Sequence, residues 1–326
     1  MRLGSYSFAT PIILAPMAGV SDRAFRALCR AHGADYAPSE MTAADPTLRA
    51  TPQTQRRLNL HGEAAPRIVQ IAGADPEALA NAARASVDAG AEIIDINMGC
   101  PAKRVCNRLA GSALLKDEAL VARILNAVVN AVAVPVTLKT RTGWDLEHRN
   151  AVTIARMAED CGIQAMTLHG RTRACGYQGL AEYTTIAAVK AAVTIPVIAN
   201  GDITTPEKAR SVLAQTGADG LMIGRGAQGD PWLFARIKAY LADGIHVLPP
   251  PRDDILRTVR QHLAQIHDLY GSPLGVRIAR KHAHWYLSRW KLGGIAARAR
   301  FNRLESAEAQ IQFFDNDQEQ LLGEAA

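Results

Sequence analysis

Residues 93–101 of this 326-residue chain read IIDINMGCP, a short apolar run that ends in polar residues, glycine and proline. Comparable β-branched apolar runs recur along the first 245 residues, and segments with helical periodicity separate them. There are eight runs, at residues 11–14, 36–39, 67–71, 93–96, 134–138, 165–168, 195–198 and 220–223. Buried strands that alternate with helices are typical of a parallel sheet covered by helices. The sequence therefore predicts an α/β fold.

The number of repeats distinguishes two α/β folds. Alanine-rich segments at 75–89, 116–132, 150–161 and 206–217 carry apolar residues at helical spacing, and glycines often end them. Eight strand–helix units fit a TIM (β/α)8 barrel better than an open dinucleotide-binding sheet. No GxGxxG motif follows the first run, which weakens the second fold further.

Composition excludes several classes of protein. A hydrophobic content of 48% is enough for a large core, and no apolar run approaches the roughly 20 residues that span a bilayer. The N-terminal residues lack the apolar region of a signal peptide, so we expect a cytoplasmic protein with no membrane contact. The five cysteines form no CxxC pair, so they are expected to be reduced thiols, with neither disulfides nor a metal site. A monomer is the default expectation.

Charge is distributed unevenly along the chain. Residues 252–303 hold eleven Lys or Arg against three acids, whereas residues 305–326 hold six acids and no Lys or Arg. A basic segment of this kind permits a polyanionic partner such as nucleic acid. The change in composition places a boundary near Ile245, between residues 1–245 and 246–326.

Polar and glycine residues follow the predicted strands, where a barrel gathers its active-site loops. Glycines after the last two strands favour a bound phosphate, because their backbone lets an anion approach closely. Gln70, Lys139 and His169 would surround a planar ring with several hydrogen-bonding edges. A lysine beside a flavin stabilises its anionic reduced form, so a flavin is favoured, with pyridoxal phosphate as the alternative.

Several motifs carry a resemblance to a known family. They are APMAGVSDRAFR (15–26), SEM (39–41), QIAG (70–73), DINMGCPAKRV (95–105), LAGSALL (109–115), KTRTGW (139–144), LHGRTR (168–173), IANGDI (198–203), MIGRGAQGDPW (222–232) and RIARKHAHWYL (277–287). Together these segments resemble the tRNA-dihydrouridine synthases, most closely the bacterial DusB branch. The resemblance covers nearly the whole chain.

The resemblance implies an FMN enzyme, reduced by NADPH, that saturates the C5–C6 bond of uridines in the tRNA D-loop, with position 17 expected. It implies a TIM barrel over residues 1–245 and a small all-helical tRNA-binding domain over 246–326. Cys100 matches the catalytic cysteine, which we read as the acid that protonates C5 after hydride transfer to C6. The residues that match FMN contacts are Pro16, Met17, Ala18, Gln70, Lys139, His169, Asn200, Gly201, Asp202, Gly224 and Arg225.

Substrate contacts are expected at the barrel mouth and on the basic segment. The candidates for contact with uracil or tRNA are Asn97, Arg141, Arg171, Arg173, Arg277, Arg280 and Lys281. His262, His267, His282 and His284 are expected at the surface or against nucleic acid. Asp202 is also a candidate N-cap for the helix that follows it.

Cys106 departs from the DusB pattern, in which asparagine directly follows the valine; here Asn107 comes one position later. We expect Cys106 to be an exposed thiol whose replacement leaves most activity intact.

Two other functions stay open on sequence grounds. One is an FMN barrel dehydrogenase that acts on a free pyrimidine, as dihydroorotate dehydrogenases do. The other is a tRNA-binding protein in which catalysis is secondary. The basic segment argues against the first, and the complete set of flavin and acid residues argues against the second.

Overall fold

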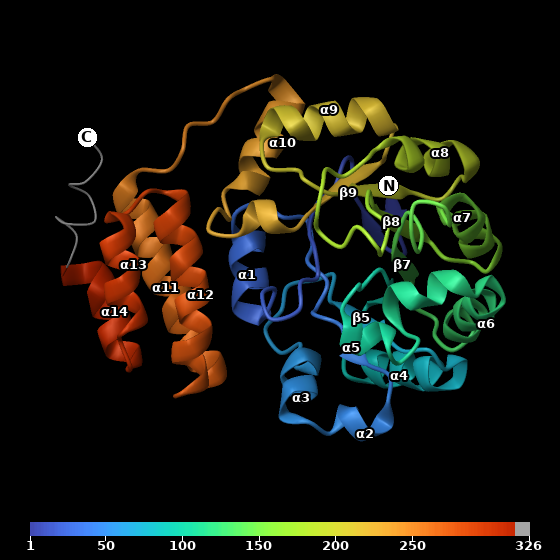
Figure 1. The fold of residues 1–326 in the computed structure, drawn as a ribbon, viewed down its shortest axis with the longest axis horizontal. Helices are drawn as coiled ribbons and strands as arrows, with labels where there is room; N and C mark the ends of the chain where they lie inside the picture. Colours follow the sequence, from blue (N-terminus) through green and yellow to red (C-terminus); the bar gives the residue numbers. More distant parts are fainter. Residues whose placement is uncertain (317–326) are drawn as a thin grey trace.

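The computed structural model describes residues 1–316, apart from the side chains of Arg49 and Asn316, so the last part of the acidic tail (317–326) lies outside the described residues. Eight parallel strands form one sheet in the order β3-β10-β9-β8-β7-β6-β5-β4 (Figure 1). Their bounds are β3 Ile12–Leu14, β4 Thr42–Ala43, β5 Ile68–Ala72, β6 Ile93–Met98, β7 Val136–Arg141, β8 Ala165–His169, β9 Val197–Asn200 and β10 Gly220–Ile223. This is the predicted TIM barrel.

One predicted strand is wrong. Residues 36–39 are not a strand, and β4 begins later, at Thr42. Isolated hydrogen bonds still close the barrel here, because the Leu14 N–H donates to Tyr36 O at 3.2 Å and the Ser39 N–H donates to Ile68 O at 2.8 Å. Pro38 has no N–H, so a continuous ladder through this segment is impossible.

Helices follow the strands and cover the outside of the barrel (Figure 1). The larger ones are α1 Arg23–Ala31, α4 Pro76–Asp88, α6 Glu118–Val129, α7 Ala151–Asp160, α8 Thr184–Ala192, α9 Pro206–Thr216 and α10 Leu233–Asp243. Short segments lie in the loops: α2 Pro46–Arg49, α3 Pro52–Leu58, α5 Lys103–Cys106, η1 Gly111–Lys116 and η2 Arg225–Ala227. The N-cap of α9 is Thr205, whose hydroxyl accepts from the Lys208 N–H at 3.1 Å, so the capping role considered for Asp202 is wrong.

The amino ends of the strands are closed by a hairpin, β1 Arg2–Leu3 and β2 Tyr6–Ser7. Leu3 is fully buried against residues that begin the strands, including Ile68, Ile93 and Ala165. Apolar packing therefore fills this end of the barrel. The polar residues that follow the strands lie at the opposite end.

Four further helices form a bundle beside α1 and α10 (Figure 1): α11 Arg252–Tyr270, α12 Leu274–Arg289, α13 Gly294–Asn302 and α14 Ala307–Asn316. Leu263, Phe301 and Phe314 belong to its own buried cluster. Two polar contacts at the end of α12 tie the bundle to the barrel. Arg289 Nη2 lies 2.9 Å from the buried Asp230, and Trp290, just after the helix, donates its indole N–H to Gly229 O at 2.7 Å.

The expectation that all four histidines are at the surface is wrong for two of them. His262 and His282 are 0% and 1% exposed, and their rings lie 4.8 Å apart between α1 and the bundle. The His262 ring also stacks on Phe25 at 5.6 Å. Both histidines lie on helices at the spacing of apolar residues, and this spacing indicates burial better than the charge of the side chain does.

Burial of His262 makes acid sensitivity a testable property. Desolvation lowers its pKa to about 3 in the folded protein, whereas an unfolded histidine titrates near 6.5. The neutral ring therefore contributes its full stability above pH 6.5 and loses it as the pH falls, by about 2 kcal/mol at pH 5. Urea unfolding at pH 7.5 and 5.0 measures this loss, which should shrink by that amount in His262→Phe. An equal loss in the variant would contradict the assignment.

Candidate active site at the barrel mouth

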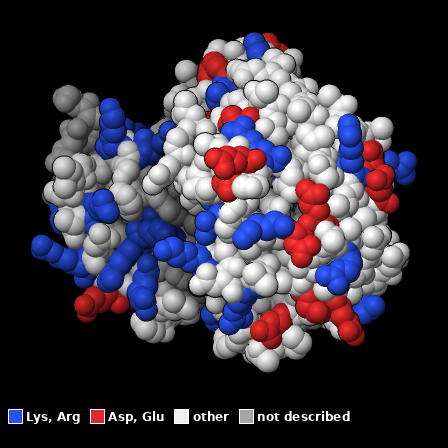
Figure 2. Space-filling model, turned by 45° about the vertical axis from the view of Figure 1, so that its right-hand side comes forward, with Lys and Arg blue, Asp and Glu red and all other residues white. Residues whose placement is uncertain are grey.

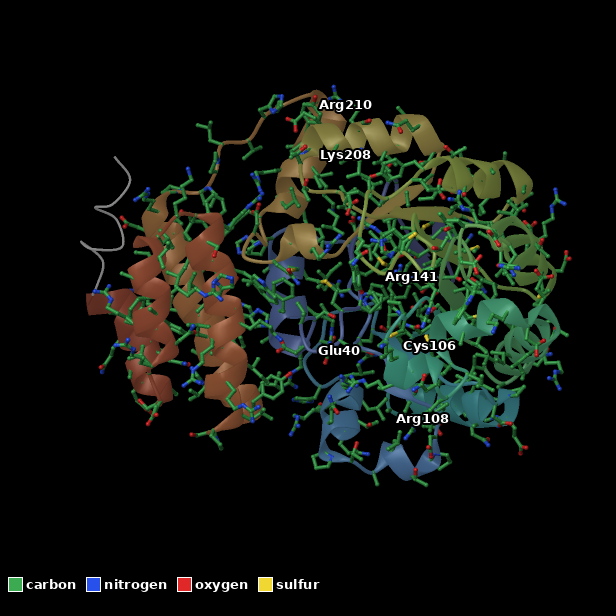
Figure 3. The ribbon with its side chains drawn as sticks, in the orientation of Figure 1. Glu40, Cys106, Arg108, Arg141, Lys208 and Arg210 are labelled. Carbon is green, nitrogen blue, oxygen red and sulfur yellow. The ribbon has the colours of Figure 1, made fainter. Side chains whose placement is uncertain are left out.

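A cavity of about 1020 Å³ opens at the carboxyl ends of the strands. Its lining includes all eleven residues expected to contact FMN, from Pro16 to Arg225, as well as Asn97, Cys100, Arg141, Arg171 and Arg173. Figure 3 shows Arg141 near the middle of the barrel, whereas Lys208 and Arg210 lie on α9. The fold therefore brings one large set of predicted residues together. The role of each in binding stays a prediction.

A buried lysine lies in this cavity. Lys139 Nζ donates to Asn200 Oδ1 at 3.0 Å, and the Asn200 amide donates in turn to Met222 O at 2.7 Å. Burial, followed by the nearby Arg141 charge, lowers the pKa of Lys139 to about 8. The ammonium is still protonated at neutral pH, so it presents one fixed positive charge to the cavity.

His169 is a neutral hydrogen-bonding group beside that charge. Burial and then the Lys139 charge lower its pKa to about 2. Arg171 Nη1 lies 3.2 Å from its Nε2, and a guanidinium can only donate, so Nε2 accepts and Nδ1 carries the proton.

Arg171 is a buried residue with several hydrogen bonds inside the loop after β8. It is 3% exposed, and its guanidinium donates to Asp202 Oδ2 at 2.7 Å and to Gly179 O at 2.7 Å. The second oxygen of Asp202 accepts from Arg225 at 3.0 Å. Arg171 is thus held inside the loop while it lines the cavity, and its contact with tRNA stays a prediction.

A glycine follows each of the last two strands, and the backbone requires it after β9. Gly201 has φ +131°, and a Cβ there would lie 2.6 Å from the Ala181 Cβ. Strands β9 and β10 are parallel neighbours, and Met222 lies opposite Asn200. The residues after these strands, Gly201 and Gly224, are therefore close together. The half-exposed Arg225 follows immediately. Two adjacent backbone turns and an arginine therefore form a small cradle suited to an anion.

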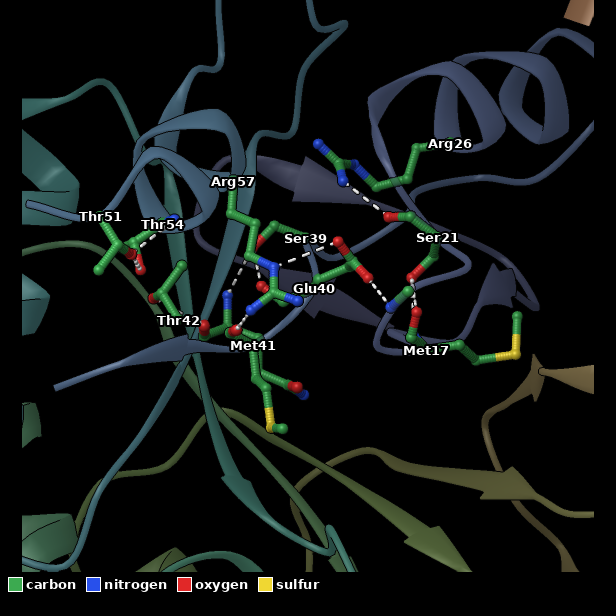
Figure 4. Close-up of polar contacts among 12 residues, drawn as sticks. Met17, Ser21, Arg26, Ser39, Glu40, Met41, Thr42, Thr51, Thr54 and Arg57 are labelled. Atoms are coloured by element: carbon green, nitrogen blue, oxygen red, sulfur yellow. Dashed lines mark hydrogen bonds and ion pairs between the residues drawn. The ribbon is translucent and has the colours of Figure 1, made fainter. Parts of the chain in front are cut away.

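The loop at Pro16–Ala18 is fixed from behind by a residue whose role sequence reasoning missed. Glu40 is buried, accepts from the Gly19 N–H and pairs with Arg57 at 3.2 Å (Figure 4). The Met17 N–H donates to Ser21 Oγ at 2.7 Å. An ion pair formed beneath the SEM motif thus holds the loop against the cavity.

Cys100 lies on a loop that is held at both of its peptide groups. Its N–H donates to Asn97 Oδ1 at 3.0 Å, and its carbonyl accepts from Ser112 Oγ at 2.9 Å. Burial raises the pKa of the Cys100 thiol above its usual value. The side chain is consequently a thiol at neutral pH, suited to donating a proton rather than to nucleophilic attack.

Cys106 is not the exposed thiol that we expected. It is 7% exposed, and its Sγ lies 3.6 Å from both Cys100 O and Ser112 Oγ. Figure 3 labels Cys106 in the barrel half of the molecule. Its position on the inner face of the short helix α5 accounts for the burial. Cys106 therefore packs behind Cys100.

The remaining arginines of the mouth, Arg141 and Arg173, have different surroundings. Arg141 is 2% exposed and donates to Gly99 O at 2.7 Å and Gly176 O at 2.8 Å, so it can meet only a group that enters the cavity. The Arg173 guanidinium lies 4.4 Å from the Trp144 ring centre.

The three basic residues predicted on the bundle do not line the cavity. Arg277 is exposed, but Arg280 donates to Leu304 O at 3.0 Å and Lys281 donates to Gly19 O. Lys281 thus joins the bundle to the cavity loop. Figure 2 shows Lys and Arg side chains gathered over the bundle and the adjoining part of the barrel. Arg277 is the clearest of the three as a phosphate contact.

Among residues 1–316 there is no group of three His, Cys, Asp or Glu arranged to hold a metal ion. Within the same range, no helix has the length and apolar character to cross a membrane.

The fold and site define a barrel enzyme whose active site lies at the carboxyl ends of its strands. Residues 13–325 match the family model described as dihydrouridine synthase (Dus). The chain belongs to the dihydrouridine synthase family, whose members are flavin-dependent oxidoreductases.

Relatives place it within that family. A protein of Pseudomonas aeruginosa named tRNA-dihydrouridine synthase B is 56% identical over 330 residues, which cover 100% of this chain and 99% of the relative. A Vibrio cholerae protein of the same name is 54% identical over 97% of this chain and 99% of its own. The sequence thus falls in the DusB branch.

The solved structure of histamine dehydrogenase from Rhizobium sp. 4-9 aligns with 81% of this chain and 50% of its own, at 13% identity and a TM-score of 0.56. This likeness concerns the barrel fold alone.

Proposed function

We propose that this protein reduces the C5–C6 bond of a uridine in the tRNA D-loop, at position 17, with bound FMN and with NADPH as electron donor. The observation that carries the proposal is one cavity that holds the Lys139 ammonium, the neutral His169 and the protonated Cys100 thiol. The names of the relatives support tRNA as the substrate. A cytoplasmic location and a monomeric state stay predictions.

The residues of the cavity fit FMN. A volume of about 1020 Å³ is at the upper limit of typical small-molecule sites and leaves room for a base beside the cofactor. The Gly201–Gly224–Arg225 cradle would hold the phosphate, and Lys139 would lie against the polar edge of the ring. When bound and reduced, FMN supplies the hydride for uracil C6.

The protein's own contribution is to place and protonate the base. Asn97 near the end of β6 and Cys100 in the loop that follows both line the cavity, so an amide and a thiol would face the same entering group. Negative charge that builds on C5 during hydride addition is neutralised by the Cys100 proton. Because Cys100 is partly buried, this acid stays protonated until the base arrives.

A uridine within folded tRNA must leave its stack to enter the cavity, at a cost of a few kcal/mol. Phosphate contacts from the basic bundle offset that cost. We propose that residues 246–326 serve this purpose and that residues 1–245 carry the chemistry. A free pyrimidine would need no such surface, which disfavours the dihydroorotate-type alternative.

The proposal is tested by assaying the purified protein with NADPH and tRNA from a strain that lacks dihydrouridine. Mass spectrometry of the tRNA should show a gain of two hydrogens at position 17. Orotate and free uridine serve as competing substrates. Reduction of either in preference to tRNA would support the alternative enzyme, and tRNA binding without reduction would support the binding-protein reading.

Salt should weaken tRNA affinity steeply while FMN retention stays unchanged, because only the former depends on counterion release. Replacing the exposed Arg277 with alanine should reduce the slope of log K against log salt by about 1. Fluorescence titrations at several salt concentrations measure the slope. Arg2→Ala is the matched control, since Arg2 is exposed on the hairpin at the opposite end of the barrel. Equal slopes for wild type and Arg277→Ala would remove this residue from the interface.

A further inference from the structure

Asp95 is a buried carboxylate that does not line the cavity and that the proposed chemistry does not use. It lies on β6, directly in register with Gln70 on β5 and Thr137 on β7. Gln70 Nε2 donates to Asp95 Oδ2 at 2.6 Å, and Thr137 Oγ1 donates to Asp95 Oδ1 at 2.7 Å. Each oxygen of the carboxylate therefore has a side-chain donor from a neighbouring strand.

The contact with Gln70 continues to the Cys100 loop. Because Asp95 accepts from the Gln70 amide nitrogen, the Gln70 carbonyl oxygen must face the other way. That oxygen accepts from Asn97 Nδ2 at 2.8 Å. The remaining Asn97 oxygen accepts from the Gly99 N–H at 3.2 Å and from the Cys100 N–H at 3.0 Å.

Every bond in this chain runs in the same direction, with donors pointing toward Asp95. A primary amide has two nearly isosteric orientations, and the reversed orientation of Asn97 would set its NH₂ group against two backbone N–H donors. The ionised carboxylate can only accept, so it fixes the Gln70 orientation that presents a carbonyl oxygen to the Asn97 amide. Bonds to a charged acceptor are also stronger than bonds between neutral groups.

We propose that Asp95 is a positioning residue for proton transfer, acting through Gln70 and Asn97 to hold the Cys100 loop. The inference rests on the proposed function. The Lys139 charge favours the ionised form of Asp95, and the Asp95 charge in turn raises the pKa of Tyr36. Burial raises the pKa of Asp95 to about 6, which leaves it mostly ionised at neutral pH. Asp95 touches neither substrate nor cofactor in this scheme.

The test separates the two half-reactions of the FMN-loaded enzyme by stopped-flow absorbance. In Asp95→Leu, which has no acceptor, reoxidation of the reduced enzyme by tRNA should be about 10²-fold slower, because small displacements of a reacting group are costly. Reduction by NADPH should stay close to the wild-type rate. Asp95→Asn can still accept from Gln70, so it should lose only about fivefold in reoxidation, as expected for weakening one hydrogen bond.

Thr137→Val is the matched control, since it removes the donor to the other carboxylate oxygen and leaves the chain to Cys100 intact. It should react with tRNA at nearly the wild-type rate. Wild-type reoxidation in Asp95→Leu would overturn the proposal. So would a parallel loss of both half-reactions and of melting temperature in Asp95→Leu and Asp95→Asn alike, since a purely structural role predicts that pattern. If wild-type enzyme itself forms no dihydrouridine, the proposed function has failed, which is a different result.

Discussion

Cys100→Ala is expected to form dihydrouridine about 10³-fold more slowly than the wild type, because general acid catalysis by a placed group contributes about 10² to 10⁴. The variant should still bind FMN and be reduced by NADPH, since Cys100 is not among the groups expected to hold the cofactor. Hydride addition without a proton donor leaves charge on C5. Single-turnover assays with tRNA, read by mass spectrometry, measure the loss.

Cys106→Ala is the control for this experiment. Cys106 belongs to the same loop as Cys100, but its side chain points away from the cavity side of that loop. Its Sγ faces Cys100 O and Ser112 Oγ from the buried side of the loop. Most activity should survive, with a small drop in melting temperature from the lost packing. Loss of activity in Cys106→Ala but not in Cys100→Ala would exchange the two assignments.

Lys139→Met is expected to slow reduction by NADPH about 10²-fold, comparable to removing one preorganised electrostatic donor from an active site. The ammonium is the buried positive charge bonded to Asn200, and methionine keeps the length of the chain without the charge. FMN content after purification should also fall. Anaerobic stopped-flow absorbance and the FMN-to-protein ratio measure the two effects.

Lys103→Met provides a comparison at the mouth of the same cavity, where the lysine is exposed. This substitution removes an equal charge and leaves the buried Lys139–Asn200 hydrogen bond in place, so the rate of reduction by NADPH should be unchanged. If NADPH reduces the Lys139→Met and Lys103→Met variants at equal rates, then the buried cation has no part in the chemistry of the flavin. The anion cradle would then be the remaining support for the cofactor.

Much of the fold was predictable because each strand carries its own local signal. Seven of the eight predicted runs overlap observed strands, and the run at 220–223 matches β10 at both ends. The exception, at 36–39, contains a proline, whose missing N–H prevents a continuous ladder despite the apolar pattern. A strand that avoids Pro38 begins closer to Thr42, where β4 starts.

The candidate site was predictable for the same reason, since a residue just after a barrel strand can only lie at the mouth. Sequence patterns were less informative about partners. Arg171 and Lys281 have the positive charge expected of phosphate contacts. In the structure, however, Arg171 donates a hydrogen bond to Asp202 and Lys281 donates one to Gly19 O. The roles of Glu40 and Asp95 were not predictable, because the sequence around an acidic residue does not show which donors will bond to it.

The sequence by itself determined the barrel, the family and the set of residues around the cavity, because strand periodicity and long motifs are local properties of the chain. Only the tertiary structure decided which polar groups are free to act and which are already bonded. Lys281 meets a carbonyl 262 residues away, and Cys106 is buried by the loop that carries Cys100. Such pairings depend on which segments the folded chain brings together, and neither composition nor spacing encodes them directly.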